Sequence, residues 1–166
     1  MKKTLVLILS TLFLGMSLMY LNKDNSLIQC SDLLKEYANT PQNIANKLHF
    51  EGCEVVNGQI ELVRATYKIK AQDSESVEDY FAKKYAIPKM QWQECHAGLC
   101  VLSTSSYLGV DFPAEKIEKL HKLDNKNLGL GLSFDMSGIY DYLGKTIKQR
   151  EYIKDFKIEI AITQSP

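Results

Sequence analysis

A strict alternation of apolar and polar residues constrains the fold of this chain more than any other feature. From Phe156 to Thr163 the even positions are Phe or Ile, and the residues between them are polar or small. From Val63 to Ala71 apolar residues likewise alternate with Arg, Thr and Lys. Since successive side chains of a strand point to opposite faces, both segments predict strands with one buried and one solvated face. Such strands are typical of an antiparallel sheet.

Turn residues indicate that the first strands are joined as a hairpin. Asn57-Gly58 separates apolar-rich runs at residues 48–56 and 59–71. The Asn-Gly pair favours a type I′ turn, because both central residues of that turn need a positive φ. Ile60 and Leu62 break the alternation of the second run, which predicts a bulge or a two-sided segment near the turn.

Shorter runs predict the rest of the sheet. Residues 90–95 and 100–108 are expected to form a second hairpin, and residues 130–136 a further strand. Residues 137–150 remain open between two interpretations. Their apolar residues have helical spacing, whereas two glycines weaken a helix.

Three segments have the apolar spacing and end signals of helices. Ser31 is the predicted N-cap of a helix over residues 32–38, and Ser76 that of a helix over residues 73–86. A proline begins a third helix, over residues 113–123. Helices interspersed with hairpins predict an α+β domain, in which the helices pack on one face of an antiparallel sheet built from hairpins.

The N-terminus has the pattern of an export signal. Lys2 and Lys3 precede an uncharged, largely apolar run at residues 4–21. As a helix this run would be about 27 Å long at ~1.5 Å per residue, close to the ~30 Å of a hydrocarbon core. No small-x-small cleavage site follows it, so residues 1–22 are interpreted as either a cleaved signal peptide or an uncleaved membrane anchor. In both cases the positive-inside rule exports the rest of the chain.

The remainder is predicted to be a linker at residues 23–29 and a single exported α+β domain at residues 30–166. The expected location is the periplasm or the exterior, with membrane contact only through residues 4–21 if they are retained. Lipid attachment at Cys30 is not expected, because no small residue precedes it. The chain has 20 basic and 20 acidic side chains. This balance lacks the basic footprint of a nucleic-acid binder, so we expect no nucleic-acid partner.

All four cysteines, Cys30, Cys53, Cys95 and Cys100, lie in the predicted exported domain. An even number in an oxidising compartment predicts two disulfides. Three pairings are possible, and we favour Cys95–Cys100 because four intervening residues suit a hairpin loop whose opposed residues lie within disulfide range. Cys30–Cys53 would then tie the start of the domain to the first hairpin. A metal site with His96 is the alternative, but C-x4-C lacks the paired spacing of zinc motifs, so no metal or other cofactor is predicted.

Several segments between residues 30 and 100 follow a recurrent pattern. Cys30-Ser31-Asp32-Leu33-Leu34 is followed by Leu48-His49-Phe50-Glu51-Gly52-Cys53, and then by Tyr67-Lys68-Ile69-Lys70 and Val77-Glu78. This order resembles a family of small exported bacterial domains of unknown function, with a C-D-x-L … L-x-F-x-x-C … Y-x-V-x-G … V-E pattern. Ala71 stands where that family tends to have Gly, and four residues separate the second cysteine pair, which tends to be adjacent in the family. The resemblance implies an exported α+β domain and no particular activity.

A tyrosine-rich segment near the C-terminus is the candidate binding region. Aromatic residues mixed with charged ones are typical of recognition surfaces. Core tyrosines beside ordinary surface lysines are the alternative interpretation. The candidate binding residues are Tyr140, Tyr142, Lys145, Lys148, Arg150 and Tyr152.

No segment carries a catalytic pattern. His49, His96 and His121 are the only histidines, and no motif fixes a nucleophile or an orienting partner for any of them. The serine-rich run at residues 103–106 lacks a G-x-S-x-G elbow. Acid pairs such as the one at residues 78–79 are explained more simply by helix ends. No catalytic residue is therefore predicted.

The sequence thus favours a non-enzymatic protein-binding module of the bacterial cell envelope, whose partner is another protein in the envelope. The most specific form of this hypothesis is an immunity protein or an inhibitor of a toxin or hydrolase, which needs only a rigid complementary face. The alternative is a small-ligand carrier or an envelope accessory factor that uses the sheet face. A third hypothesis is a hydrolase without a recognisable motif, which would need one of the three histidines for turnover.

Overall fold

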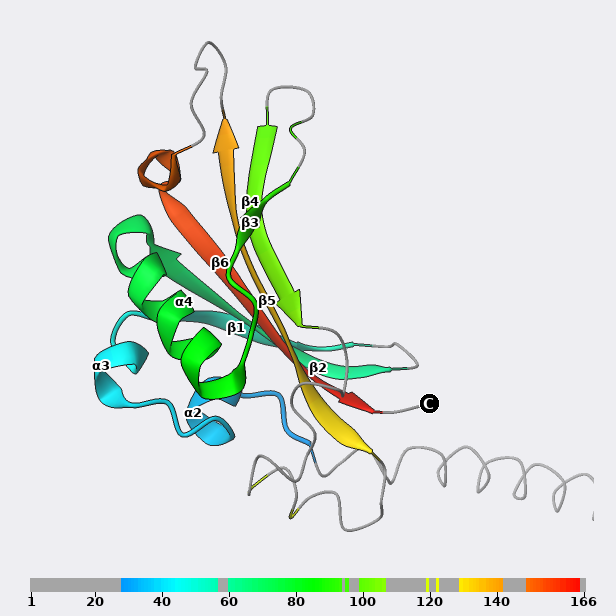
Figure 1. The fold of residues 1–166 in the computed structure, drawn as a ribbon. Coiled ribbons are helices and arrows are strands. Elements are labelled where there is room, and N and C mark those ends of the chain that lie inside the picture. Colours follow the sequence, from blue (N-terminus) through cyan, green and yellow to red (C-terminus); the bar gives the residue numbers. More distant parts are fainter. Residues whose placement is uncertain are drawn as a thin grey trace, which may run out of the picture.

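A computed structural model describes residues 28–56, 60–93, 95, 99–106, 119, 122, 129–141 and 149–164. In these residues six strands form one antiparallel sheet in the order β1-β2-β6-β5-β4-β3 (Figure 1). The predicted signal or anchor, the turn at residues 57–58 and nearly all of the helix predicted over residues 113–123 lie outside the described residues.

Both predicted hairpins are confirmed, since β1 pairs antiparallel with β2 and β3 with β4. The predicted bulge near the first turn is present as a register shift between Glu61 and Val63, in the pairing of β2 with β6. The strands are β1 (His49–Val55), β2 (Glu61–Lys70), β3 (Gln91–Trp92), β4 (Leu99–Ser106), β5 (Leu130–Asp141) and β6 (Asp155–Gln164).

The last strand joins the two hairpins into one sheet. β6 lies between β2 and β5 and is antiparallel to both. Ile160, for example, is opposite Ala65 of β2 on one side and Phe134 of β5 on the other. Because side chains alternate along a strand, this register places the apolar residues of all three strands on the same face. In the described part of the chain, β6 is the one strand that connects β1–β2 to β3–β4–β5.

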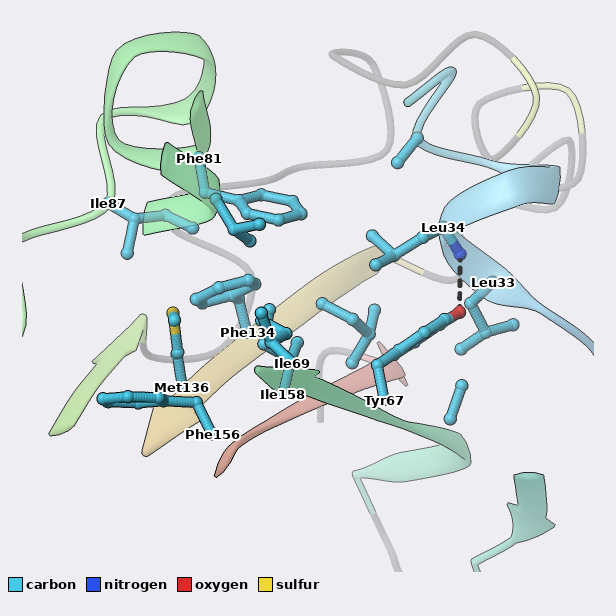
Figure 2. Close-up of a cluster of buried hydrophobic side chains, with 14 of the residues drawn as sticks. Leu33, Leu34, Tyr67, Ile69, Phe81, Ile87, Phe134, Met136, Phe156 and Ile158 are labelled. Carbon is cyan, nitrogen blue, oxygen red and sulfur yellow. Dashed lines mark hydrogen bonds between the residues drawn. The ribbon is translucent and has the colours of Figure 1, made fainter. Parts of the chain in front are cut away.

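Three helices cover that apolar face, namely α2 (Leu33–Glu36), α3 (Gln42–Ala45) and α4 (Ala71–Tyr85) (Figure 1). Phe81 of α4 packs on Phe134 of β5 with 4.7 Å between ring centroids. Figure 2 shows these rings above the strand residues Tyr67, Ile69, Met136, Phe156 and Ile158, each at most 1 % exposed. The predicted α+β fold with an antiparallel sheet is therefore confirmed.

Tyr67 fastens α2 to the sheet. Its hydroxyl accepts a hydrogen bond from the backbone N–H of Leu34 at 2.9 Å (Figure 2) and donates one to the Asp32 carboxylate at 2.7 Å. Burial raises the pKa of Tyr67, and the hydrogen bond to Asp32 raises it further, so the hydroxyl remains a donor. This contact joins a buried strand residue to the first turn of a helix that has only four residues.

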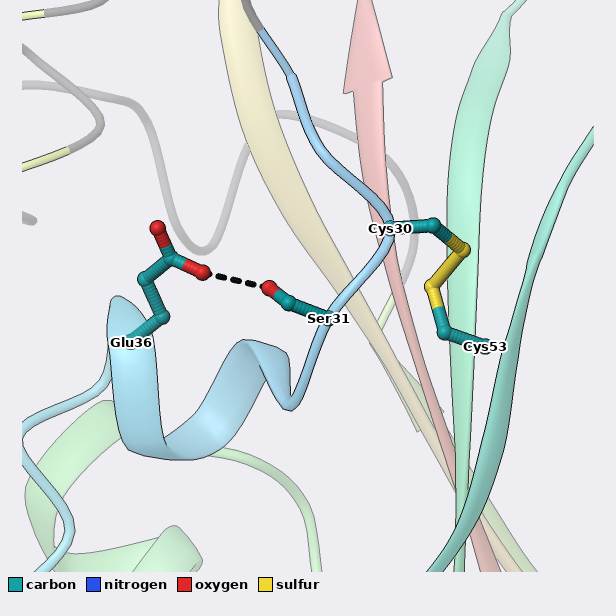
Figure 3. The surroundings of a disulfide bond; sticks show 4 residues. All are labelled: Cys30, Ser31, Glu36 and Cys53. Atoms are coloured by element: carbon teal, nitrogen blue, oxygen red, sulfur yellow. Dashed lines mark hydrogen bonds between the residues drawn. A yellow bond between two sulfur atoms is a disulfide. The ribbon is translucent and has the colours of Figure 1, made fainter.

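The N-cap of α2 is Asp32, and the prediction of Ser31 is wrong. The Asp32 carboxylate accepts a hydrogen bond from the backbone N–H of Lys35 at 3.1 Å. Because the helix begins at Leu33, Ser31 stands one residue too early to cap it, and its hydroxyl donates to the Glu36 carboxylate instead (Figure 3).

Helix α4 begins two residues earlier than predicted, directly where β2 ends. Its N-cap position is Lys70, which makes no side-chain cap. The prediction of Ser76 as N-cap is wrong, because Ser76 lies inside the helix and its hydroxyl donates to the carbonyl of Asp73 at 2.9 Å. The helix ends at Tyr85, and Ala86 follows in a left-handed conformation with φ 58°.

Both predicted disulfides are formed, and the chain has no free cysteine. Cys30–Cys53 joins the residues before α2 to β1 across 5.5 Å between Cα atoms (Figure 3), so the sulfur of Cys30 is not free for lipid attachment. Cys95–Cys100 closes the β3–β4 hairpin. The Cα atoms of the two cysteines are 4.2 Å apart. Two disulfides indicate an oxidising, exported environment.

Residues 137–141, the first part of the segment whose secondary structure the sequence did not decide, form a strand, since β5 runs past Met136 to Asp141. Gly138 lies in this extension because the covered face has no room for a side chain there. A Cβ at Gly138 would come within 2.5 Å of the Phe156 ring and 2.8 Å of the Ile153 side chain. Within the described residues, no helix has both the length and the apolar composition that a membrane crossing requires.

The Tyr67 contact leads to a test of stability. Tyr67→Phe leaves the buried N–H of Leu34 without its acceptor, so we expect the free energy of unfolding to fall by about 1–3 kcal/mol. Urea denaturation of the oxidised protein measures this change. The control is Gln42→Ala, which removes an exposed side-chain hydrogen bond to Asn46 and should change stability by less than about 0.5 kcal/mol. A Tyr67→Phe variant as stable as the control would contradict the role given to the hydroxyl.

Candidate functional site

Half of the predicted binding residues can be located. Tyr140, Arg150 and Tyr152 are described, whereas Tyr142, Lys145 and Lys148 lie outside the described residues. The rings of Tyr140 and Tyr152 stack with their centroids 5.5 Å apart, and Trp92 of β3 meets Tyr140 edge-on at 6.3 Å. Tyr140 is 2 % exposed and belongs to the core, while Tyr152 is 44 % exposed. Of this aromatic group, Tyr152 is therefore the member that presents a ring to solvent.

Arg150 is held inside the fold by an ionic network on the covered face. Its Nη1 donates to the Glu78 carboxylate at 2.5 Å, and its Nε donates to the Ser74 hydroxyl at 2.8 Å. Glu78 is 5 % exposed, and its second oxygen accepts the backbone N–H of Met90 at 2.5 Å. The guanidinium also lies over the Phe156 ring, 5.1 Å from its centroid. Arg150 thus joins the short 3-10 helix η3 (Arg150–Tyr152) to the side of α4.

This network could not be found from spacing, because its two charged residues are 72 positions apart. The V-E element of the resemblance and the acid pair at residues 78–79 are the sequence signals that include Glu78. Two contacts between other residues of the quoted motifs are also internal to the fold. Cys30 is bonded to Cys53, and Asp32 to Tyr67.

The remaining polar candidates also serve the fold where they can be seen. Thr104 donates to the carbonyl of Pro88 at 2.7 Å, and Ser106 accepts the backbone N–H of Phe134 at 3.2 Å. His49 lies on the exposed edge strand β1, while His96 and His121 lie outside the described residues. No group of three or more His, Cys, Asp or Glu side chains that could hold a metal ion occurs in the described part of the chain.

The sheet has a second face, which none of the described helices covers (Figure 1). We call it the open face, and it carries the odd-numbered side chains of β4, β5 and β6 and the even-numbered ones of β2 from Arg64 onward. Part of it is closely packed, since Ser133, Ala161 and Thr163 are buried. Exposed side chains of this face lie on β4 and the second half of β5, and on the charged residues Lys68, Lys70, Asp155 and Lys157 of β2 and β6.

An apolar patch lies at one end of the open face. Ile139 of β5 is 62 % exposed and stands directly opposite Val101 of β4. Leu99, which is two residues from Val101 on the same face, is 47 % exposed. Leu99, Val101 and Ile139 form the apolar patch. Neighbouring exposed apolar side chains of this kind are typical of interaction surfaces, whereas single ones are ordinary.

Two carboxylates face each other four residues along β5 from this patch. Asp135 of β5 is directly opposite Glu159 of β6. Partial desolvation raises the pKa of Asp135, as do Glu159 and Glu61, while Arg64 lowers it. The two neighbouring acids have partners, since Lys157 donates to Glu159 at 2.8 Å and Arg64 pairs with Glu61. Asp135 has no hydrogen bond or ion pair with any described residue, and the charge of Arg64 offsets the neighbouring acids only in part.

Comparison with known proteins adds nothing to this geometry. No family model, no curated protein and no solved structure matches the chain. The candidate site therefore rests on the open face itself, with its apolar patch and its acid pair.

The ionic network generates a second test of stability. Arg150→Met leaves Glu78 buried without its counterion, so we expect the free energy of unfolding to fall by about 3 kcal/mol. The double variant Glu78→Gln/Arg150→Met should recover part of that loss, because it removes both charges. Lys89→Met is the control, since it removes an exposed ion pair with Asp79 and should cost less than about 1 kcal/mol. Equal losses for Arg150→Met and Lys89→Met would contradict the network.

The acid pair predicts that removing the Asp135 carboxylate stabilises the protein at neutral pH and not at acidic pH. Because the pKa of Asp135 is raised, the folded protein binds this proton more tightly than the unfolded chain does. The ionised carboxylate therefore lowers stability above the folded pKa, and the cost disappears below the unfolded value of 3.8. Asp135→Asn should raise the midpoint of urea unfolding at about pH 7 and leave it unchanged at about pH 3. A loss of stability at neutral pH would show that the carboxylate is compensated.

Proposed function

We propose that this protein is a non-enzymatic protein-binding module of the bacterial cell envelope. The observation that carries the proposal is the open face, where Ile139, Val101 and Leu99 expose apolar surface at one end of the paired strands β4 and β5. A strand pair is a rigid support, and the Cys95–Cys100 disulfide closes the hairpin to which β4 belongs. Rigid surfaces lose little conformational entropy when they bind, which favours affinity.

The contacts made by the polar side chains favour a binding function over a catalytic one. On the covered face, Tyr67, Glu78 and Arg150 are occupied by contacts within the fold. In β4, the hydroxyls of Thr104 and Ser106 bond to backbone atoms. The open face offers the unpaired Asp135 beside hydroxyl and apolar side chains, which suits recognition of a surface. Catalysis by a side chain needs a second group that orients or activates it.

The most specific form of the proposal is an immunity protein or inhibitor whose partner is a toxin or hydrolase that acts outside the cytoplasmic membrane. Such a partner is blocked when a rigid face covers its working surface, and the inhibitor needs no chemistry of its own. Export to the periplasm, with residues 4–21 either removed or kept as a tether, belongs to this proposal. The two disulfides support the exported location.

Membership of the family of small exported bacterial domains is part of the same proposal. Its support is that the quoted motif residues contact one another, with Cys30 bonded to Cys53 and Asp32 hydrogen-bonded to Tyr67. Motif residues that contact one another inside the fold can be shared by proteins whose binding surfaces differ. On this view the resemblance carries no information about the partner.

A small-ligand carrier is the second candidate, and one groove favours it. The groove has a volume of about 510 Å³ and lies between α2, α3 and β2, lined by residues that include Lys35, Asn39, Thr40, Gln42 and Tyr67. Its size is that of a ligand pocket, but such pockets are mostly apolar. Here much of the lining is polar, and the Tyr67 hydroxyl is already occupied by Leu34 and Asp32. A thermal-shift screen with metabolites tests this candidate, which predicts a saturable rise in the melting temperature.

Affinity capture tests the protein-binding function. The oxidised protein, purified after export, serves as bait for envelope extracts of its own and competing strains. The matched control bait is the same protein after reduction and alkylation of its cysteines, which removes both disulfides. We expect a stoichiometric protein on the oxidised bait alone, and an inhibitor additionally predicts loss of that protein's activity. If no protein binds at micromolar bait, the proposed function is wrong.

A further inference from the structure

We propose that the open face docks a partner protein that places a basic side chain between Asp135 and Glu159 and an apolar side chain on the patch of Leu99, Val101 and Ile139. This inference rests on the proposed function, and it names the surface and the chemistry of the partner. Tyr152 lies in η3 and stacks on Tyr140, whose side chain belongs to the covered face, so it is not part of this surface.

The strand register fixes where the two contacts lie. Asp135 and Ile139 are on the same face of β5 and four residues apart, which corresponds to about 14 Å at ~3.4 Å per residue. Between them the face carries Ser137 of β5 opposite Ser103 of β4. On the other side of Ser137 stands Lys157 of β6, which bonds to Glu159, so a partner element that lies along β5 passes beside this lysine and can reach both ends. The partner must therefore present its basic and apolar groups about 14 Å apart.

Charge complementarity identifies the basic group. Asp135 faces Glu159 across the strand pair, and Glu61 adds a third carboxylate nearby. Lys157 is engaged with Glu159 and Arg64 with Glu61, so Asp135 remains without a cation of its own. A Lys or Arg from outside would neutralise this excess, and like charges that face each other are otherwise unfavourable.

The span of the surface points to a protein rather than to a single ion. The described residues include no group of His, Cys, Asp and Glu that could hold a metal. The exposed Ile139 needs an apolar contact that an ion cannot supply. Interfaces typically combine a central apolar anchor with a charged contact near the rim, and Arg is prominent among the residues that dominate their binding energy.

Stability gives an independent argument for the role of Asp135. A carboxylate that is only partly compensated and stands opposite a second one lowers the stability of the free protein, and Asn at this position would remove that cost. Residues that reduce stability without serving a contact in the fold are typical of functional surfaces. Asp135→Asn should therefore stabilise the free protein and weaken the complex, a combination that a structural role does not produce.

The test uses the protein captured by the wild-type bait, purified and titrated by calorimetry against variants. We expect Asp135→Asn to weaken binding at least tenfold and Asp135→Lys at least a hundredfold, because the second change repels the basic group. Ile139→Ser should weaken binding about tenfold. Lys83→Ala is the matched control, since it changes an exposed residue of α4 away from the open face, and it should bind as wild type does. The salt dependence of binding should be smaller for Asp135→Asn than for wild type.

Other results separate this inference from the proposed function. A partner that binds Asp135→Lys and Ile139→Ser as tightly as wild type, but loses affinity for Tyr152→Ser, would overturn the docking surface and leave the protein-binding function standing. Dimerisation of the protein itself that Ile139→Ser abolishes, seen by sedimentation, would replace the basic partner by a second copy. The absence of any captured protein would overturn both proposals.

Discussion

The pairing of β6 with both β2 and β5 is the interaction on which the rest of this structure depends. The first hairpin and the β3–β4–β5 unit meet in the sheet only through β6, and the register places Phe156, Ile158 and Ile160 in one apolar layer beneath the helices. Each disulfide lies within one half, Cys30–Cys53 in the first and Cys95–Cys100 in the second, so neither can replace this strand. Lys70 of β2 pairs with Asp155 of β6, so this pairing joins parts of the chain that are far apart in sequence and must close a long loop.

The two faces of the sheet use their polar residues in opposite ways. Beneath the helices, Tyr67 bonds to Asp32 and Leu34, and Arg150 neutralises Glu78, although Nη2 of Arg150 is buried without a hydrogen-bond partner among the described residues. On the open face, Asp135 is left without a cation, and Ile139 without apolar cover. These two groups lie where a partner can reach them. This contrast, more than any single residue, supports a binding surface on the open face.

Local patterns in the sequence predict the strands, the hairpins and the disulfides, because each depends on residues that are close together in the chain. The position of β6 beside β2 depends on a distant pairing, which alternation alone does not specify. The predictions of Ser31 and Ser76 as N-caps were wrong for different reasons. Helix α2 begins one residue further along the chain than a cap at Ser31 requires, and helix α4 follows directly on β2, so that Ser76 lies inside it. Ile139 could not be assigned to the open face, since Gly138 and the helical spacing of residues 139–147 hid the end of β5. The opposition of Asp135 and Glu159 likewise follows only from the register.

Amide hydrogen exchange of the oxidised protein, resolved by NMR, tests the central place of β6 most directly. If β6 links the two halves, its amides between Phe156 and Ile162 should exchange only through global unfolding, as slowly as those of β2 and β5 that face them. The edge strands β1 and β3 should exchange faster, through local opening. Exchange of the β6 amides at the rates of the edge strands would contradict this account of the fold, and with it the open face that the fold creates.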